Sequence, residues 1–196
     1  MSQPTFHLIS LGEFCGPAQV VEAVNLRTGS YPFDWLYSFQ KENIDFVLEM
    51  LQQKSIESVY QKYVTIHYEL GWDRNKYGFV FPHEPNVYSD EFKEKFRRRI
   101  QRFYDLIVSG ATIYFVFSNR SGKLDGPLFD LFITEVNKVN RKCKLIIFHG
   151  DETLKVTHPN VVQRFYNYGK CPDSEIAARD NVYKGWMRYQ LADMIN

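Results

Sequence analysis

The residues of greatest chemical interest lie in the short stretch Leu11–Pro17 (LGEFCGP). We expect a buried strand before it and a helix after it, which places Cys15 just ahead of a helix N-terminus. The first N–H groups of a helix are unpaired and the helix dipole is positive there, so a thiolate is favoured at such a position. Cys15 is therefore a candidate nucleophile, and a buried structural cysteine is the alternative.

A cysteine nucleophile usually needs a base, and histidine suits this role because its pKa lies near neutrality. Two of the five histidines are well placed to reach the Cys15 turn, His83 in a loop and His149 at the end of an expected strand. Each also has an ordinary explanation, because polar residues are common where strands end.

A third group would orient the base. Asp34 is the first choice, because it lies within the aromatic segment Tyr31–Trp35 (YPFDW), and an acid among aromatic residues tends to be buried and to need a partner. Capping of the turn is its alternative role. Glu84 and Asp151 are weaker choices.

A basic run, Arg97 to Arg99 with Arg102, lies on a long expected helix. Glu94 and Arg98 have the i,i+4 spacing of an ion pair. A solvated helix face is the first explanation of this run, and a site for phosphate or an acidic sugar is the second.

Short apolar runs and amphipathic stretches alternate along the chain. Buried strands are expected at Phe6–Leu11, Ile113–Phe117, Lys144–Phe148 and Val161–Tyr166. Helices are expected at Pro17–Leu26, Asn43–Gln53, from Ser89 to Gly110, Leu128–Val139 and Tyr183–Ile195.

This alternation predicts an α/β fold: a single-domain three-layer sandwich over residues 1–196, Rossmann-like, with a mostly parallel sheet. Two further strands, Tyr63–Leu70 and Tyr77–Phe81, predict a small β-hairpin insertion. Sites in such sheets lie beyond the carboxyl ends of the strands. That rule selects three loops, Gly12–Gly16, Ser118–Arg120 and His149–Asp151.

Composition excludes several classes of protein. The 196 residues are 44% hydrophobic and 16% aromatic, which excludes disorder over most of the length, and the net charge of +1 argues against a nucleic-acid partner. No apolar run is long enough to span a membrane, and we expect neither a signal peptide nor a membrane partner.

The three cysteines fit neither a disulfide framework nor a zinc motif, so we expect a reducing, cytoplasmic setting. Nucleotide and metal motifs are absent, and we expect no cofactor and no metal.

The opening of the chain resembles a known family. Ser10–Cys15, Leu26-Arg27 and Ser30–Trp35 are similar to the "LG..C … LR..S.PFDW" opening of DUF1796, a family labelled as papain-like cysteine peptidases. The similarity extends loosely through Phe81–Glu84 to the arginine-rich helix and the strand that follows it.

The resemblance implies Cys15 as nucleophile and His83 as base, with Asp34 as third member. Papain-type enzymes carry a Gln shortly before the Cys. Residues Ile9 to Phe14 contain none, so backbone N–H groups at the helix start would stabilise the oxyanion. We expect Trp35, Glu84, His149 and Arg27 to bind the substrate.

The sequence therefore predicts a cysteine-dependent hydrolase acting on a peptide or a small acyl or glycan substrate. A non-catalytic or glycan-related module is the alternative, because aromatic residues gather near Trp35, Trp72 and Trp186. A structural or host-interaction protein with a degenerate site is a third. The sequence makes no prediction of the oligomeric state.

Overall fold

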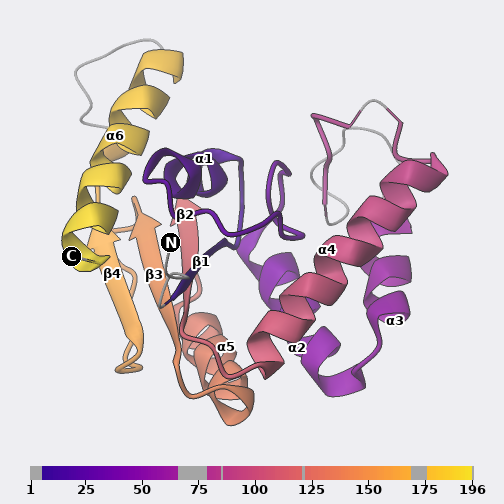
Figure 1. Cartoon of the computed structure of the whole chain (residues 1–196). Coiled ribbons are helices and arrows are strands. Elements are labelled where there is room, and N and C mark those ends of the chain that lie inside the picture. The colour runs from indigo at the N-terminus through magenta and orange to yellow at the C-terminus, as the bar shows by residue number, and fades with distance from the viewer. Residues whose placement is uncertain (1–5, 66–78, 85, 121, 169–175, 196) are drawn as a thin grey trace.

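A four-stranded parallel sheet, in the order β1-β2-β3-β4, lies at the centre of the computed structural model (Figure 1). The structure describes residues 6–65, 79–84, 86–120, 122–168 and 176–195. The strands are β1 (His7–Ser10), β2 (Ile113–Asn119), β3 (Cys143–His149) and β4 (Val161–Phe165). Strands that are consecutive in the sequence are neighbours in the sheet, and each pair of neighbours is parallel. The four strands expected in the sheet are therefore all present, each within a few residues of its expected ends.

Helices cover both faces of the sheet (Figure 1). Along a strand, successive side chains point to opposite faces. Phe115 and Phe117 of β2 pack in one hydrophobic cluster, whereas Val116 between them packs in the other. The first cluster contains residues of α2 (Gln40–Gln53), α4 (Asp90–Val108) and α5 (Gly126–Val139), and the second those of α1 (Gly16–Ala23) and α6 (Ile176–Ile195). The predicted three-layer α/β sandwich is confirmed.

Capping residues set the starts of two helices. The Ser89 hydroxyl accepts a hydrogen bond from the Phe92 N–H at 3.1 Å, so α4 begins where its sequence predicts. The Asp125 carboxylate accepts one from the Leu128 N–H at 3.0 Å, and α5 therefore begins two residues before the expected Leu128.

The expected hairpin is wrong where the structure describes it. Tyr63, the expected start of its first strand, lies in a π-helical turn, η1 (Gln61–Thr65), that directly follows α3 (Ile56–Tyr60). Val59, Tyr60, Tyr63 and Val64 are all buried, and their spacing suits one face of a helix. The remainder of the hairpin, residues 66–78, lies outside the described residues. Val80 forms a single antiparallel bridge with Tyr37.

Candidate functional site

The three loops selected from the sequence meet at the carboxyl edge of the sheet. The Asn119 amide at the end of β2 donates a hydrogen bond to the Glu13 carboxylate after β1, at 2.5 Å. The Gly150 N–H after β3 donates to the Asn119 carbonyl at 3.2 Å. The three loops are therefore in contact with one another.

Two glycines permit this close approach. Gly12 has φ +74°, a left-handed conformation that turns the chain immediately after β1. A Cβ atom on Gly150 would lie 2.3 Å from the Arg120 carbonyl oxygen, so a larger residue would push apart the loops that follow β2 and β3.

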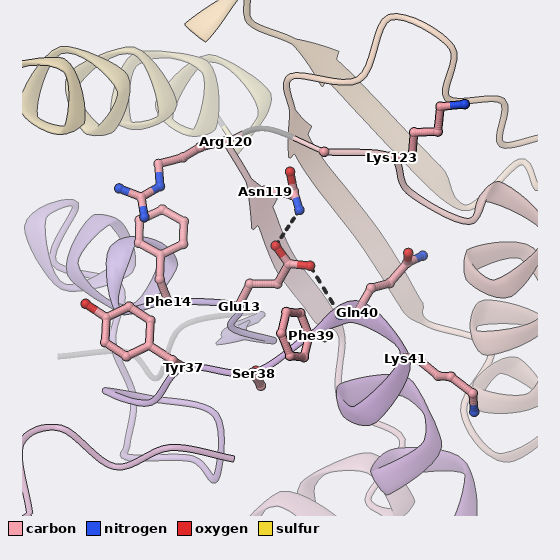
Figure 2. Close-up of a pocket in the computed structure, with 11 residues that line it drawn as sticks. Glu13, Phe14, Tyr37, Ser38, Phe39, Gln40, Lys41, Asn119, Arg120 and Lys123 are labelled. Atoms are coloured by element: carbon pink, nitrogen blue, oxygen red, sulfur yellow. Dashed lines mark hydrogen bonds between the residues drawn. The ribbon is translucent and has the colours of Figure 1, made fainter. Parts of the chain in front are cut away.

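A cavity of about 480 Å³ opens at this edge, between β1, β2 and the start of α2 (Figure 2). Its lining includes Glu13, Ser38 and Asn119 together with the aromatic rings of Phe14, Tyr37 and Phe39. The volume falls in the range of small-molecule sites, which are typically lined by aromatic groups and a few polar ones.

Glu13 is the chemically distinctive group of the cavity. Burial raises the pKa of its carboxyl to about 7, and the repulsion of Glu42 adds to this. Hydrogen bonds from Asn119 and from the Gln40 N–H, and the positive charge of Arg120, act in the opposite direction. A carboxyl that titrates near neutrality suits proton donation and acceptance at physiological pH.

Two residues that line the cavity each carry a buried polar atom without a hydrogen-bond partner among the described residues. The Ser38 hydroxyl and the Asn119 carbonyl oxygen Oδ1 are buried, and neither pairs with another group in the described part of the chain. Both atoms are closed to the cavity, and the Ser38 hydroxyl faces Gly12, where a Cβ atom would lie 3.1 Å from it.

Arg120 forms one wall of the cavity and is held in place from two sides. Its guanidinium pairs with the Asp180 carboxylate of α6 and lies over the ring of Phe14, 4.5 Å from the ring centroid. Tyr168 also donates to Asp180 at 2.6 Å. The charge of Arg120 is therefore largely compensated.

Cys15 directly precedes α1 and follows Phe14 of the cavity lining, while its own side chain packs against the second hydrophobic cluster. It is half-buried and reduced, and its carbonyl accepts the Gln19 N–H at 3.0 Å. Pro17 occupies the first turn of α1 and has no N–H to donate. The predicted position of the thiol at the start of a helix beyond β1 is confirmed.

A second group of side chains consists of Arg27, Asp34, Trp35 and His83. Arg27 pairs with the buried Asp34 carboxylate at 3.0 Å and lies over the Trp35 ring, 5.5 Å from its centroid. The Trp35 ring meets the His83 ring edge-to-face, with centroids 6.1 Å apart. Trp35 has φ +64°, a strained conformation for a bulky residue and one that often accompanies a functional site.

Asp34 was expected to need a partner, and that partner is Arg27. The carboxylate also accepts the Tyr31 N–H at 3.0 Å. Burial raises the pKa of Asp34, while the Tyr31 N–H and the charges of Arg27 and Arg99 lower it. Among the described residues, no hydrogen bond joins Asp34 to His83, so the two predicted catalytic groups are linked only through Arg27 and Trp35.

His83 and Cys15 flank the same segment of chain without a hydrogen bond between them in the described residues. The Ser38 N–H donates to the Glu13 carbonyl, and the adjacent Tyr37 pairs with Val80. The His83 side chain is exposed, whereas that of Cys15 is half-buried. Glu84, expected to bind substrate, forms an ion pair with Lys95 of α4.

His149 lies in a separate, smaller cavity of about 290 Å³ beyond β3 and β4. Its Nδ1 is 3.0 Å from the Asp151 carbonyl oxygen, and burial lowers the pKa of the ring. The Asp151 carboxylate accepts hydrogen bonds from Leu124 and Thr153. The structure thus places His149 and His83 at different sites.

The arginine run of α4 serves mainly to join elements. Arg97 forms a two-point ion pair with Glu57 of α3, at 2.7 and 2.9 Å. Arg102 donates to the Ser30 carbonyl at 2.7 Å. Arg98 forms the predicted i,i+4 pair with Glu94. These contacts favour the structural explanation over an anion site.

Glu13 and Asn119 are the site residues that sequence reasoning missed. The rule that sites lie beyond the carboxyl ends of parallel strands selected the loops that contain Glu13 and Asn119. It did not identify which side chains of these loops face each other. In the described part of the chain, no group of three or more metal-ligating side chains occurs. None of the described helices is both long and apolar enough to cross a membrane.

Comparison with known proteins gives a match at the family level and one similar protein. Residues 6–69 match the model of the family described as "Putative papain-like cysteine peptidase (DUF1796)". The chain is also 26% identical to "Uncharacterized protein R408" of Acanthamoeba polyphaga mimivirus, over 97% of this chain and 96% of that protein. No solved structure matches the chain. The matched segment contains Cys15, Arg27, Asp34 and Trp35, and it ends before His83.

Proposed function

We propose that this chain is a thiol-dependent hydrolase of peptide or small acyl substrates, with Cys15 as nucleophile and His83 as base. The observation that carries the proposal is the position of Cys15. It is a free, half-buried thiol at the start of α1, beyond the carboxyl end of β1 and next in sequence to Glu13 and Phe14, which line the cavity. The match to a family described as cysteine peptidases supports the same chemistry.

In this reaction the Cys15 Sγ attacks the substrate carbonyl carbon and gives a tetrahedral intermediate. Collapse of the intermediate breaks the bond to the leaving group, which takes the proton that His83 removed from the thiol. Water then hydrolyses the thioester and restores the thiol. The unpaired N–H groups at the start of α1 are the proposed donors to the oxyanion, with the exception of Pro17, which has none.

His83 reaches Cys15 in this scheme by a movement of its exposed side chain. Asp34 acts as a positioning residue, because it fixes Arg27, which lies over Trp35, whose ring contacts His83. Arg27, Trp35 and Glu84 are the residues proposed to bind the substrate near His83.

The first test is chemical labelling of the thiol in the full-length protein. We expect Cys15 to react with iodoacetamide at pH 6.5 at least tenfold faster than free glutathione, with the modified residue located by mass spectrometry. The buried Cys143 serves as the unreactive internal reference. Labelling of Cys15 no faster than glutathione would contradict an activated nucleophile.

The second test is turnover of p-nitrophenyl esters and peptide amides. Cys15→Ser should abolish turnover, and His83→Ala should lower it by about 10² or more, the usual contribution of a general base. His149→Gln is the matched control and should retain activity. Full activity in Cys15→Ser overturns the proposal, and loss confined to His149→Gln overturns the role of His83.

The positioning role of Trp35 is tested by a conservative exchange. Trp35→Ala should lower kcat and shift the pH dependence of turnover, because His83 loses its ring contact. Trp35→Phe keeps an aromatic edge at the same place and should restore most of the activity. An unchanged pH profile in Trp35→Ala would contradict this role.

A further inference from the structure

We propose that the cavity lined by Glu13, Phe39 and Arg120 binds a small carboxylic acid in its ionised form. The carboxylate lies at Arg120, and an apolar or aromatic body lies against the rings of the cavity wall. Binding at this site does not depend on the thiol chemistry proposed for Cys15, whose side chain packs against the second hydrophobic cluster.

Arg120 lines the cavity with a guanidinium group that is only partly engaged. Both of its hydrogen bonds to the Asp180 carboxylate come from Nη1, so the ion pair leaves the edge formed by Nε and Nη2 unused. The Phe14 ring, with its centroid 4.5 Å away, supports the guanidinium plane. The parallel N–H groups of such an edge match the two oxygens of a carboxylate.

The charge of the lining favours an anion over a neutral ligand. Lys41 lines the cavity and is paired with Asp45. Lys123 also lines it and forms no ion pair within the described residues. Its exposed side chain points away from Glu13 (Figure 2), so it meets a bound anion by turning toward the cavity. An anion there gains a charge partner that no described carboxylate already occupies.

Glu13 is acidic, and its protonation determines how well the cavity tolerates an anion. Burial raises the pKa of its carboxyl to about 7, with Glu42 of α2 and Arg120 acting in opposite directions. Tyr183 of α6 also faces Glu13, and burial raises the pKa of its hydroxyl, which stays neutral. Below pH 7 Glu13 is therefore mainly neutral and does not repel a bound carboxylate.

The aromatic wall favours a carboxylate with an apolar body over an inorganic anion. Phe39 is 45% exposed, and its ring lies beside Glu13 in the cavity (Figure 2). Phe14 and Tyr37 line the same space. Contact with an apolar ligand would remove this aromatic surface from water, which is favourable, whereas phosphate offers no such contact.

The test uses the full chain and four probes: benzoate and hexanoate as carboxylates with an apolar body, benzamide as a neutral analogue, and inorganic phosphate. Calorimetric titration at pH 6 gives each Kd. We expect benzoate or hexanoate to bind at least fivefold more tightly than benzamide and phosphate. Binding of neither carboxylate, or of benzamide or phosphate as tightly as the better carboxylate, overturns the proposal.

Variants of Arg120 place the carboxylate. Arg120→Lys keeps a positive charge beside Asp180 but lacks the two-nitrogen edge, so it should weaken benzoate binding at least fivefold. Arg98→Lys on α4 is the matched control, because Arg98 also pairs with a carboxylate, that of Glu94, and does not line the cavity. Unchanged affinity in a folded Arg120→Lys variant overturns the proposal.

Phe39→Ala tests the aromatic wall and remains informative if Arg120→Lys fails to fold. It should weaken benzoate binding at least fivefold. Leu131→Ala on α5 is the matched control, since Leu131 is 47% exposed and does not line the cavity. Melting curves confirm that each variant folds. Equal affinity in Phe39→Ala and the native chain overturns the proposal.

The pH dependence of binding tests Glu13, because benzoate is ionised at both pH 6 and pH 8.5. We expect binding in the native chain to be at least threefold tighter at pH 6, and Glu13→Gln to remove most of this difference. A difference that persists in Glu13→Gln contradicts the role of Glu13. Cys15→Ala should bind benzoate with unchanged Kd, whether or not the native chain hydrolyses any substrate, and a weakened Kd would contradict a separate site.

Discussion

At the scale of single residues, Glu13 is a carboxyl under opposing influences. Burial favours its protonated form, while the Asn119 amide, the Gln40 N–H and Arg120 favour the carboxylate. Burial is the largest of these effects, and the pKa of Glu13 rises from 4.5 to about 7. The folded protein therefore binds a proton at Glu13 that the unfolded chain releases between these two values.

Glu13→Gln should stabilise the protein at pH 8 and have little effect at pH 5. Because the folded-state pKa of about 7 lies above 4.5, the favourable contribution of Glu13 is complete below 4.5 and is lost as the pH rises through 7. The charged groups that face Glu13 are Glu42 of α2 and Arg120. Thermal melting should show Tm rising by about 2–4 °C at pH 8, the effect of roughly 1 kcal/mol in a domain of this size.

The control for this experiment is Glu94→Gln, which removes a carboxylate that is 72% exposed in its side chain. Its effect on Tm should be small at both pH values. An equal change of Tm at pH 5 and pH 8 in Glu13→Gln would show that Glu13 is ionised in the folded protein throughout this range.

The sequence predicts some residue properties and leaves their partners open. Asp34 was expected to be buried and to need a partner, because it lies among aromatic residues, and it is buried. Its partner, Arg27, is only seven positions away but is reached through a turn whose path the sequence does not specify. Glu13 and Asn119 are separated by 106 positions, so their hydrogen bond depends on the complete sheet.

At the scale of elements, local signals in the sequence determined most helix and strand ends. Ser89 before an acidic first turn and Gly110 after the last turn gave the extent of α4 closely, because capping is a property of neighbouring residues. The segment at Tyr63 was misassigned. Its aromatic and β-branched residues favour a strand locally, whereas the contacts of α3 with α2 and α4 hold it in a helical form.

Ser89→Ala should destabilise the protein by about 1 kcal/mol, because it leaves the Phe92 N–H at the start of α4 without its acceptor. Chemical denaturation with urea measures this change in the free energy of unfolding. Gln101→Ala, on the exposed side of the same helix, is the control and should change the stability by less than about 0.5 kcal/mol. A Ser89→Ala variant as stable as the control would show that water replaces the cap without loss.

At the scale of the whole molecule, the strands differ in how firmly the sheet holds them. β3 has a neighbour on each side and is almost fully buried, whereas β4 pairs only with β3 and its side chains are partly exposed. Both strands are parallel members of one sheet, so the difference lies in burial and pairing alone.

Native-state hydrogen exchange should reveal this difference. Amide protons of Leu145–Phe148 in β3 should exchange only through global unfolding, and those of β4 should exchange through a local opening of lower free energy. Peptide-resolved mass spectrometry measures both in one experiment. Equal protection of β3 and β4 would show that the sheet opens as a single unit.

The order of the strands has a consequence for how the chain is made. β1 pairs with β2, yet residues 11–112 separate them along the chain. At about 5–20 residues per second, a ribosome needs roughly 5–20 s to make this interval. During that time the apolar Leu8 and Ile9 have no strand to pair with, so the nascent chain presents them to chaperones. Glu13 meets Asn119 only after β2 has emerged, so the cavity cannot form until more than half of the chain has been made.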